Sequence, residues 1–241
     1  MLHYCSFYIT KYFSVIEKYD LVAVPVIDSI GRLVGQITVD DVMDQVREHQ
    51  ERDYQLASGI SQDIETDDSV LRQTSARLPW LLIGIAGGIG NSMILGSFDT
   101  TFAQHPEMAL FIPLIGGTGG NVGTQSSAIV VQGLANNSLT AKDTWKQVAK
   151  ETTVAMLNAT IITLLVYIYN FVVYGGAATV TYAVSLSLFC VVMFASLFGA
   201  MVPLIMERLK IDPAIATGPF VTIINDIIGM LIYMGITVFL T

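Results

Sequence analysis

Residues 219–240 read PFVTIINDIIGMLIYMGITVFL, an apolar run with a single acidic side chain, Asp226, near its middle. A run of this length crosses the roughly 30 Å hydrocarbon core of a bilayer as one helix. A carboxylate at that depth costs about 2.5 to 3.5 kcal/mol on insertion scales, and such residues usually face a water-filled cavity or an ion pathway. The stretch therefore predicts a membrane-spanning helix with an ion site at Asp226.

The composition extends this prediction to most of the chain. Of its 241 residues, 53% are hydrophobic and 13% are charged, whereas an ordinary soluble domain has about 25% charged residues. Apolar runs long enough to span a membrane lie at roughly 79–98, 108–135, 153–174, 180–206 and 214–240. We therefore predict an all-α integral membrane protein with five transmembrane helices, in which Asp226 is the one acidic residue inside the apolar runs.

The basic residues indicate the orientation of these helices. All twelve lie before the first run, between the second and third runs, or between the fourth and fifth. Positive charge gathers in cytoplasmic loops. We therefore expect a multi-pass protein of the plasma (cytoplasmic) membrane with a cytoplasmic N-terminus and an external C-terminus.

Charge and residue types disfavour two function classes. The formal net charge of −8 argues against nucleic acid, which needs a basic surface, and suits a divalent cation. An intramembrane aspartyl protease needs two carboxylates that share a proton, but Asp226 stands alone in the apolar runs. A serine or metal-dependent protease would need a base or metal ligands there, and the runs contain no histidine. We therefore expect no enzyme.

The segment before the membrane has the pattern of a small α/β unit. Residues 21–28 and 33–38 are predicted as strands around a turn at 29–32, with Asp40 as the N-cap of a helix from about Asp41. This stretch resembles the second half of a CBS domain. Two strands and one helix cannot bury a core by themselves, so we expect the other half to be missing through truncation.

We therefore divide the chain into a partial CBS domain (1–45), connecting helices (46–76) and a five-helix transmembrane pore domain (77–241). The first predicted helix carries an acidic cluster that could bind hard cations through oxygen. A solvated helix face is the alternative interpretation. The cluster consists of Asp40, Asp41, Asp44, Glu48, Glu51 and Asp53.

The second apolar run contains GGTGGNVGTQSS at residues 116–127, which places glycines and polar side chains at membrane depth. Glycines spaced four apart can simply allow close helix packing. The interleaved Thr118, Asn121 and Gln125 favour a polar lining instead, with glycines that let the backbone approach a pore.

These motifs, taken in order, resemble the MgtE family of magnesium transporters. The likeness rests on residues 79–82 (PWLL), the glycine-rich run, Asp212-Pro213, residues 218–220 (GPF) and residues 225–229 (NDIIG). It covers residues 21–241. The resemblance implies a homodimer in membrane lipid with a channel-like magnesium path at the dimer axis, lined by the second and fifth helices, and Mg²⁺ as both transported ion and regulatory ligand.

Residue roles follow from the resemblance by position. Asp226, Thr222 and Asn121 would contact the metal, and Thr118, Gly120 and Gln125 would line the pore. Asp41, Asp44 and Asp53 would bind regulatory magnesium, although His49 and Arg52 stand where the family commonly has acidic residues. The alternatives are transport of another divalent cation, such as Mn²⁺ or Co²⁺, and a CBS-linked membrane scaffold without transport.

Overall fold

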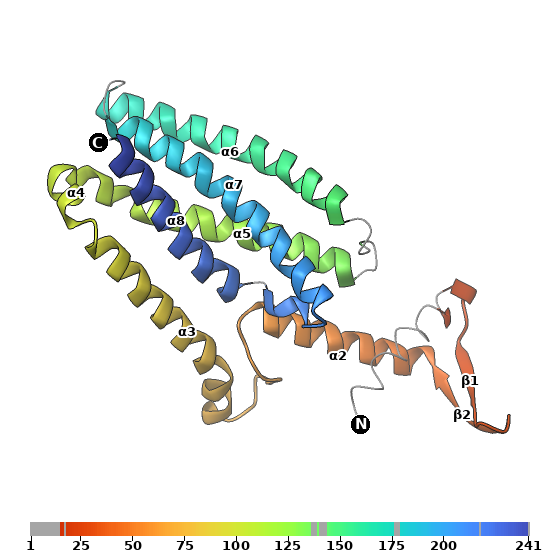
Figure 1. Cartoon of the computed structure of the whole chain (residues 1–241). Coiled ribbons are helices and arrows are strands. Elements are labelled where there is room, and N and C mark those ends of the chain that lie inside the picture. Colours follow the sequence, from red (N-terminus) through yellow and green to blue (C-terminus); the bar gives the residue numbers. More distant parts are fainter. Residues whose placement is uncertain are drawn as a thin grey trace. The chain divides into compact units, whose positions relative to one another are not determined.

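Figure 1 shows the computed structural model of the chain. The structure describes residues 15, 16, 18–135, 139, 144–175, 179–216 and 218–240, so the first 14 residues of the predicted partial CBS domain lie outside the described part. The chain divides into two compact units, Met1–Tyr54 and Gln55–Thr241. Each unit is considered by itself below.

The first unit contains a β-hairpin that confirms the predicted strand, turn and strand. Strands β1 (Ala23–Ile27) and β2 (Leu33–Thr38) pair antiparallel. The Asp28 carboxylate closes the turn because Oδ1 accepts from the backbone N–H of Ile30 at 3.0 Å and of Arg32 at 2.8 Å. Apolar side chains on the hairpin stay uncovered, and Leu33 is 71% exposed. This agrees with the expectation that two strands cannot bury a core.

Helix α2 (Val39–Ala57) follows β2 directly, and its N-cap differs from the predicted one. The Thr38 hydroxyl accepts from the Asp41 backbone N–H at 3.3 Å, while Asp41 Oδ2 accepts from the Thr38 backbone N–H at 2.9 Å. This reciprocal pair is a capping box. The prediction of Asp40 as the N-cap was wrong. The helix begins two residues earlier than expected, at Val39, so Thr38 directly precedes it and is the N-cap.

The second unit is helical. Helix α3 (Val70–Gly96) packs mainly on α8, whereas α7 lies at the centre against α5, α6 and α8 (Figure 1). The core between them is apolar, and the buried Tyr233 hydroxyl donates to the Met108 carbonyl oxygen at 2.7 Å. The remaining elements are α4 (Asp99–Gln104), the 3₁₀ helix η1 (Pro106–Phe111), α5 (Ile112–Ala135), α6 (Thr144–Tyr174), α7 (Thr179–Arg208), the 3₁₀ helix η2 (Pro213–Ala216) and α8 (Pro219–Leu240).

Four of these helices are long and apolar enough to cross a membrane: α3, α6, α7 and α8. The chain is thus a helical, multi-pass membrane protein by length and composition. Helix α5 is long enough, at 24 residues, but its polar run keeps it outside this set. Four helices begin elsewhere than the predicted runs. Helices α3 and α6 begin nine residues earlier, at Val70 and Thr144. Helices α5 and α8 begin later, at Ile112 and Pro219, because the 3₁₀ helices η1 and η2 precede them.

Candidate functional site

Asp226 lies half-buried on α8 and faces a notch in α5 made by two glycines. A Cβ atom added at Gly116 or at Gly120 would lie 3.6 Å from Asp226 Oδ1. The missing side chains therefore leave room beside the carboxylate. In the part of the chain that the structure describes, no basic side chain pairs with Asp226. The carboxylate is free to meet a cation from outside the protein.

Thr222 lies one turn before Asp226 on the same face of α8. A Cβ atom at Gly120 would lie 3.1 Å from Thr222 Cγ2, so Gly120 contributes to the space around both side chains. The Thr222 hydroxyl donates to the Gly218 carbonyl oxygen at 3.0 Å. Thr222 also lines a cavity of about 980 Å³ between α3, the α2–α3 connection and the start of α8, together with Arg77 and Trp80. Three of the predicted site residues, Asp226, Thr222 and Gly120, are therefore together.

The other predicted pore residues lie on a neighbouring stripe of α5. Asn121 and Gln125 are exposed and one turn apart, and Thr118 is half-exposed. They do not surround Asp226 within one chain. Positions 117, 121 and 125 adjoin the 116/120 stripe because successive residues are about 100° apart around a helix. This exposed polar stripe has no protein cover within one copy of the chain.

Two other glycines of the run, Gly119 and Gly123, serve helix packing. A Cβ atom at Gly119 would lie 3.0 Å from Val191 Cγ1 of α7, and one at Gly123 would overlap the Asn225 side chain of α8. A Cβ atom at Gly199 of α7 would overlap the Gly123 carbonyl oxygen. Both interpretations of the run are thus represented: Gly119 and Gly123 allow close packing, whereas Gly116 and Gly120 lie beside Asp226.

A buried polar cluster that the sequence reasoning missed joins three helices. Glu151 of α6 is 5% exposed, and its Oε1 accepts hydrogen bonds at 2.6 Å from the hydroxyls of both Ser126 (α5) and Ser196 (α7). The two hydroxyls lie 2.9 Å apart. The third apolar run was predicted to start at residue 153, after Glu151. Because α6 in fact begins nine residues earlier, at Thr144, Glu151 lies inside this helix. A helix predicted over residues 144–174 would have included Glu151.

Asn225, the neighbour of Asp226 in the sequence, is a second residue to which the sequence analysis gave no role. Its side chain is 1% exposed and packs at Gly123, and neither its Oδ1 nor its Nδ2 has a hydrogen-bond partner among the described residues. Sequence alone offered one signal, an amide next to the membrane carboxylate. Asn225 packs against Gly123 of α5, whereas Asp226 lies beside Gly116 and Gly120. These two adjacent residues of α8 therefore contact different stripes of α5.

The predicted regulatory residues lie along α2. Asp41 is held by its capping box, and the Thr38 hydroxyl also donates to Asp41 Oδ2 at 2.6 Å. These hydrogen bonds lower the pKa of Asp41 from its ordinary value of 3.8, with the side-chain bond as the larger cause. Asp53 follows Asp44 by nine residues, which is about 14 Å along a helix. Across the described ranges, no group of three or more His, Cys, Asp or Glu side chains comes together to hold a metal ion.

Comparison with known proteins adds to this geometry. The family profile described as "Divalent cation transporter", MgtE, matches residues 112–236, which run from the start of α5 into α8. The chain belongs to the MgtE family. It is 34% identical over 221 residues to a protein named magnesium transporter MgtE from Bacillus subtilis, and 34% identical over 225 residues to one of the same name from Thermus thermophilus.

A third MgtE relative, from Enterococcus faecalis, is 31% identical over 221 residues. These alignments cover 90 to 92% of this chain but only 48 to 49% of the relatives, so the chain spans about half of their length. The relatives are named as transporters. The MgtE family is therefore one of transporters and not of enzymes, in agreement with the expectation from residue types.

Proposed function

We propose that the chain conducts Mg²⁺ across the plasma membrane through a pore centred on Asp226. The observation that carries this proposal is a half-buried carboxylate on an apolar helix, beside glycines and without a basic partner among the described residues. The names of the relatives support magnesium as the ion.

The chemistry of magnesium fits such a site. Mg²⁺ gives up its water reluctantly and is usually bound through one or two carboxylates while it keeps several waters. The Asp226 carboxylate can accept hydrogen bonds from those waters and attract the cation, and the glycines at 116 and 120 keep the α5 side of the carboxylate clear of side chains. One turn away, the cavity of about 980 Å³ that Thr222 lines offers an approach with mostly apolar walls, to which Thr222 contributes a hydroxyl and Arg77 a guanidinium.

A second copy of the chain completes the pore in this proposal. Asn121 and Gln125 are exposed on α5, and polar side chains that face lipid are costly. Two-fold symmetry would place this stripe and Asp226 of both copies around one axis and double every axial residue. Helix α5 then serves as the fifth span, next to water and protein instead of lipid.

The orientation follows from the basic residues, with the N-terminus cytoplasmic and the C-terminus external. We keep the proposed division into a partial CBS domain (1–45), connecting helices (46–76) and pore domain (77–241). Regulation by Mg²⁺ would act through the connection to the membrane helices. Gly218 lies so close to the Ala57 carbonyl that an added Cβ would overlap its oxygen, and a Cβ at Gly59 would lie 2.7 Å from Pro219 Cγ.

In this proposal, cytosolic Mg²⁺ bound by Asp41, Asp44 and Asp53 reduces the repulsion between α2 helices of two copies. The connection at residues 57–59 then transmits this change to the first turn of α8. A ligand shifts such an equilibrium only by its differential affinity for the two states. Double substitution Asp41→Asn, Asp44→Asn should therefore reduce closure by cytosolic Mg²⁺ without reducing conduction at low Mg²⁺.

The test of the pore is Mg²⁺ uptake into proteoliposomes with Asp226→Asn. We expect uptake to fall to the level of protein-free vesicles while the protein remains folded and dimeric by gel filtration. Asp99→Asn, which removes an exposed carboxylate on α4, should retain most of the uptake. Unchanged flux in Asp226→Asn would contradict the pore assignment. Competition by Mn²⁺ or Co²⁺ that exceeds that by Mg²⁺ would favour another divalent cation, and no flux in the unmodified protein would favour a scaffold.

A further inference from the structure

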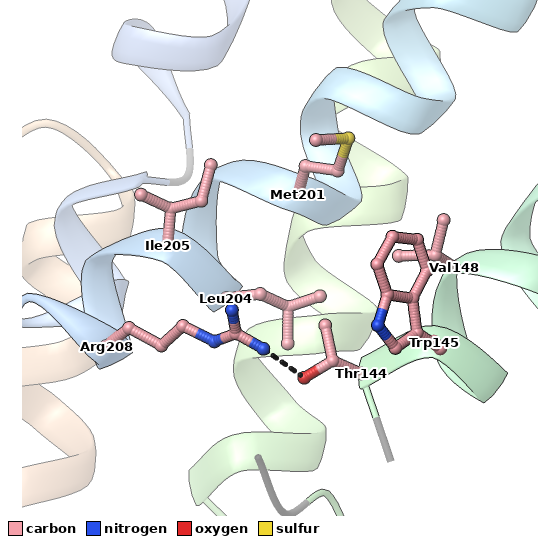
Figure 2. A pocket seen from close by; sticks show the side chains of 7 residues that line it. All are labelled: Thr144, Trp145, Val148, Met201, Leu204, Ile205 and Arg208. Carbon is pink, nitrogen blue, oxygen red and sulfur yellow. Dashed lines mark hydrogen bonds between the residues drawn. The ribbon is translucent and has the colours of Figure 1, made fainter. Parts of the chain in front are cut away.

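A narrow pocket lies between the first turn of α6 and the last two turns of α7, away from Asp226. Figure 2 shows its seven lining residues, with apolar side chains along the walls and a guanidinium at one end. Its volume is about 170 Å³. A space of this size can hold part of one extended chain of atoms, but it is too small for a helix, whose diameter with side chains is about 10 Å. The lining consists of Thr144, Trp145, Val148, Met201, Leu204, Ile205 and Arg208.

The polar end of the pocket is defined by Arg208 and Thr144. Arg208 Nη2 donates to the Thr144 hydroxyl at 3.4 Å, a long hydrogen bond to a neutral group (Figure 2). The ion pairs found among the described residues do not include Arg208. Guanidinium groups bind phosphate strongly through several N–H donors. Arg208 therefore has guanidinium N–H groups that can bind an anion at the mouth of an apolar pocket.

The pocket lies at the ends of two apolar helices, where a membrane protein meets lipid head groups. Trp145 is 81% exposed beside it, and tryptophan is enriched at the membrane–water interface. Lys146 and Lys150 follow on α6 and are also exposed. Met201 and Ile205, 45% and 48% exposed, form an apolar wall on the membrane side of Arg208. The pocket thus combines a guanidinium, an indole and apolar walls, which suit the phosphate, the glycerol region and an acyl chain of a lipid.

We propose that this pocket binds an anionic phospholipid, with its phosphate at Arg208 and the upper part of one acyl chain between Val148, Leu204 and Ile205. A free phosphate or nucleotide would leave the apolar walls unused, and an uncharged hydrophobic molecule would leave the guanidinium without an anion. Basic residues next to the membrane attract anionic lipid by about 1 kcal/mol each. Through Arg208, an anionic lipid should therefore be enriched about fivefold over a zwitterionic one.

The test uses Trp145 as the reporter. The chain has two tryptophans, so Trp80→Phe leaves Trp145 as the only one. The protein is placed in nanodiscs with equal amounts of phosphatidylglycerol and phosphatidylcholine. In one preparation the phosphatidylglycerol carries bromine near the start of its acyl chains, and in the other the phosphatidylcholine does. Head-group composition is then the same, and bromine quenches the indole only at short range.

We expect stronger quenching by brominated phosphatidylglycerol, corresponding to about a fivefold enrichment at Trp145. Arg208→Gln should remove most of this preference. Lys210→Gln, which removes a nearby positive charge outside the pocket lining, should retain it. Circular dichroism checks that both variants keep their helices.

Three results would overturn the proposal. Equal quenching by the two brominated lipids would show that the pocket does not select an anionic head group. An unchanged preference in Arg208→Gln would place the selection elsewhere. Absence of quenching by either lipid would show that protein, such as a second copy of the chain, covers Trp145. Because the readout is lipid proximity, each result is independent of whether the protein conducts Mg²⁺.

Discussion

The substitution Gly199→Ala tests the close approach of α5 and α7 that positions the candidate pore helix. A Cβ atom at position 199 would overlap the carbonyl oxygen of Gly123 and lie 2.9 Å from its carbonyl carbon and 3.0 Å from its Cα. These are backbone atoms, which cannot rotate away as a side chain could. The added methyl group can therefore be accommodated only if the two helices separate.

The magnitude follows from these distances. Carbon atoms are at ideal separation at about 3.5 to 4.0 Å, so the helices must move apart by roughly 1 Å near the contact. Forcing an extra methyl group into a packed interior costs about 1 to 3 kcal/mol. The same movement lengthens the hydrogen bond from Ser196 to Glu151, now 2.6 Å, and a lost hydrogen bond adds about 1 kcal/mol. We therefore expect a loss of about 2 to 4 kcal/mol.

Thermal unfolding in detergent, followed by circular dichroism, measures this loss. For a chain of this size about 1 kcal/mol corresponds to 2 to 4 °C, so Tm should fall by about 4 to 16 °C. The control is Gly84→Ala on α3, where an added Cβ meets no heavy atom within 4 Å. Alanine is favoured over glycine in helices by about 1 kcal/mol, so this control should be at least as stable as the parent protein.

Melting of Gly199→Ala within about 2 °C of the parent protein would contradict the close approach of α5 and α7, because no side-chain rotation can relieve a clash with backbone atoms. Equal destabilisation by Gly84→Ala would also contradict it, since the effect would then belong to glycine replacement in general. Mg²⁺ uptake by Gly199→Ala should fall together with stability, because the separation also shifts α5 relative to Asp226.

Three further predictions concern other parts of the chain. Glu151→Ala should lower the free energy of unfolding by about 2 to 4 kcal/mol, because two buried hydroxyls lose their common acceptor and a cavity remains; Glu151→Gln should cost less, and equal losses would contradict the hydrogen-bonding role. The Asp41 carboxyl should titrate below 3.8 by NMR, so its cap stabilises α2 above that pH and is lost as the pH falls through the lower folded value; a midpoint at or above 3.8 would refute this. Gly218 has φ of +55° and contacts Ala57, so Gly218→Ala should speed proteolysis within residues 58–69, and unchanged cleavage would show that the contact is dispensable.

The elements that sequence predicted well are those whose signals are local. Alternating apolar residues and Gly31, at φ +80°, were sufficient for the hairpin, because register and turn are set within a few residues. The long apolar runs predicted the helices for the same reason. Asp226 could be predicted as a site from sequence alone, because a carboxylate in hydrocarbon is costly whatever its neighbours are. The structure places it beside Gly116 and Gly120, which belong to the predicted glycine-rich motif.

The elements that sequence missed depend on contacts between distant residues. Glu151, Lys146 and Lys150 lower the hydropathy of the first turns of α6, so an apolar criterion starts that helix too late. Only the packing of α5 and α7 shows that Glu151 is enclosed while Lys150 is exposed. The choice of Thr38 over Asp40 as the N-cap is of the same kind, since both residue types cap helices well and the end of β2 decides between them.

In the proposed pore, the polarity of helix α5 is compatible with a place at membrane depth. Its glycines and polar side chains exclude it from the helices that qualify by hydropathy, yet its Gly119, Gly123 and Ser126 are buried against α7 and α8. A membrane helix must be apolar only where lipid touches it. On α5 one stripe meets protein, a second lies beside Asp226, and a third, with Asn121 and Gln125, is exposed. The proposed pore would place a second copy and water against this third stripe. The low hydropathy of α5 is therefore compatible with the role of a pore-lining helix in our proposal, and it is the strongest reason to seek the ion path between α5 and α8.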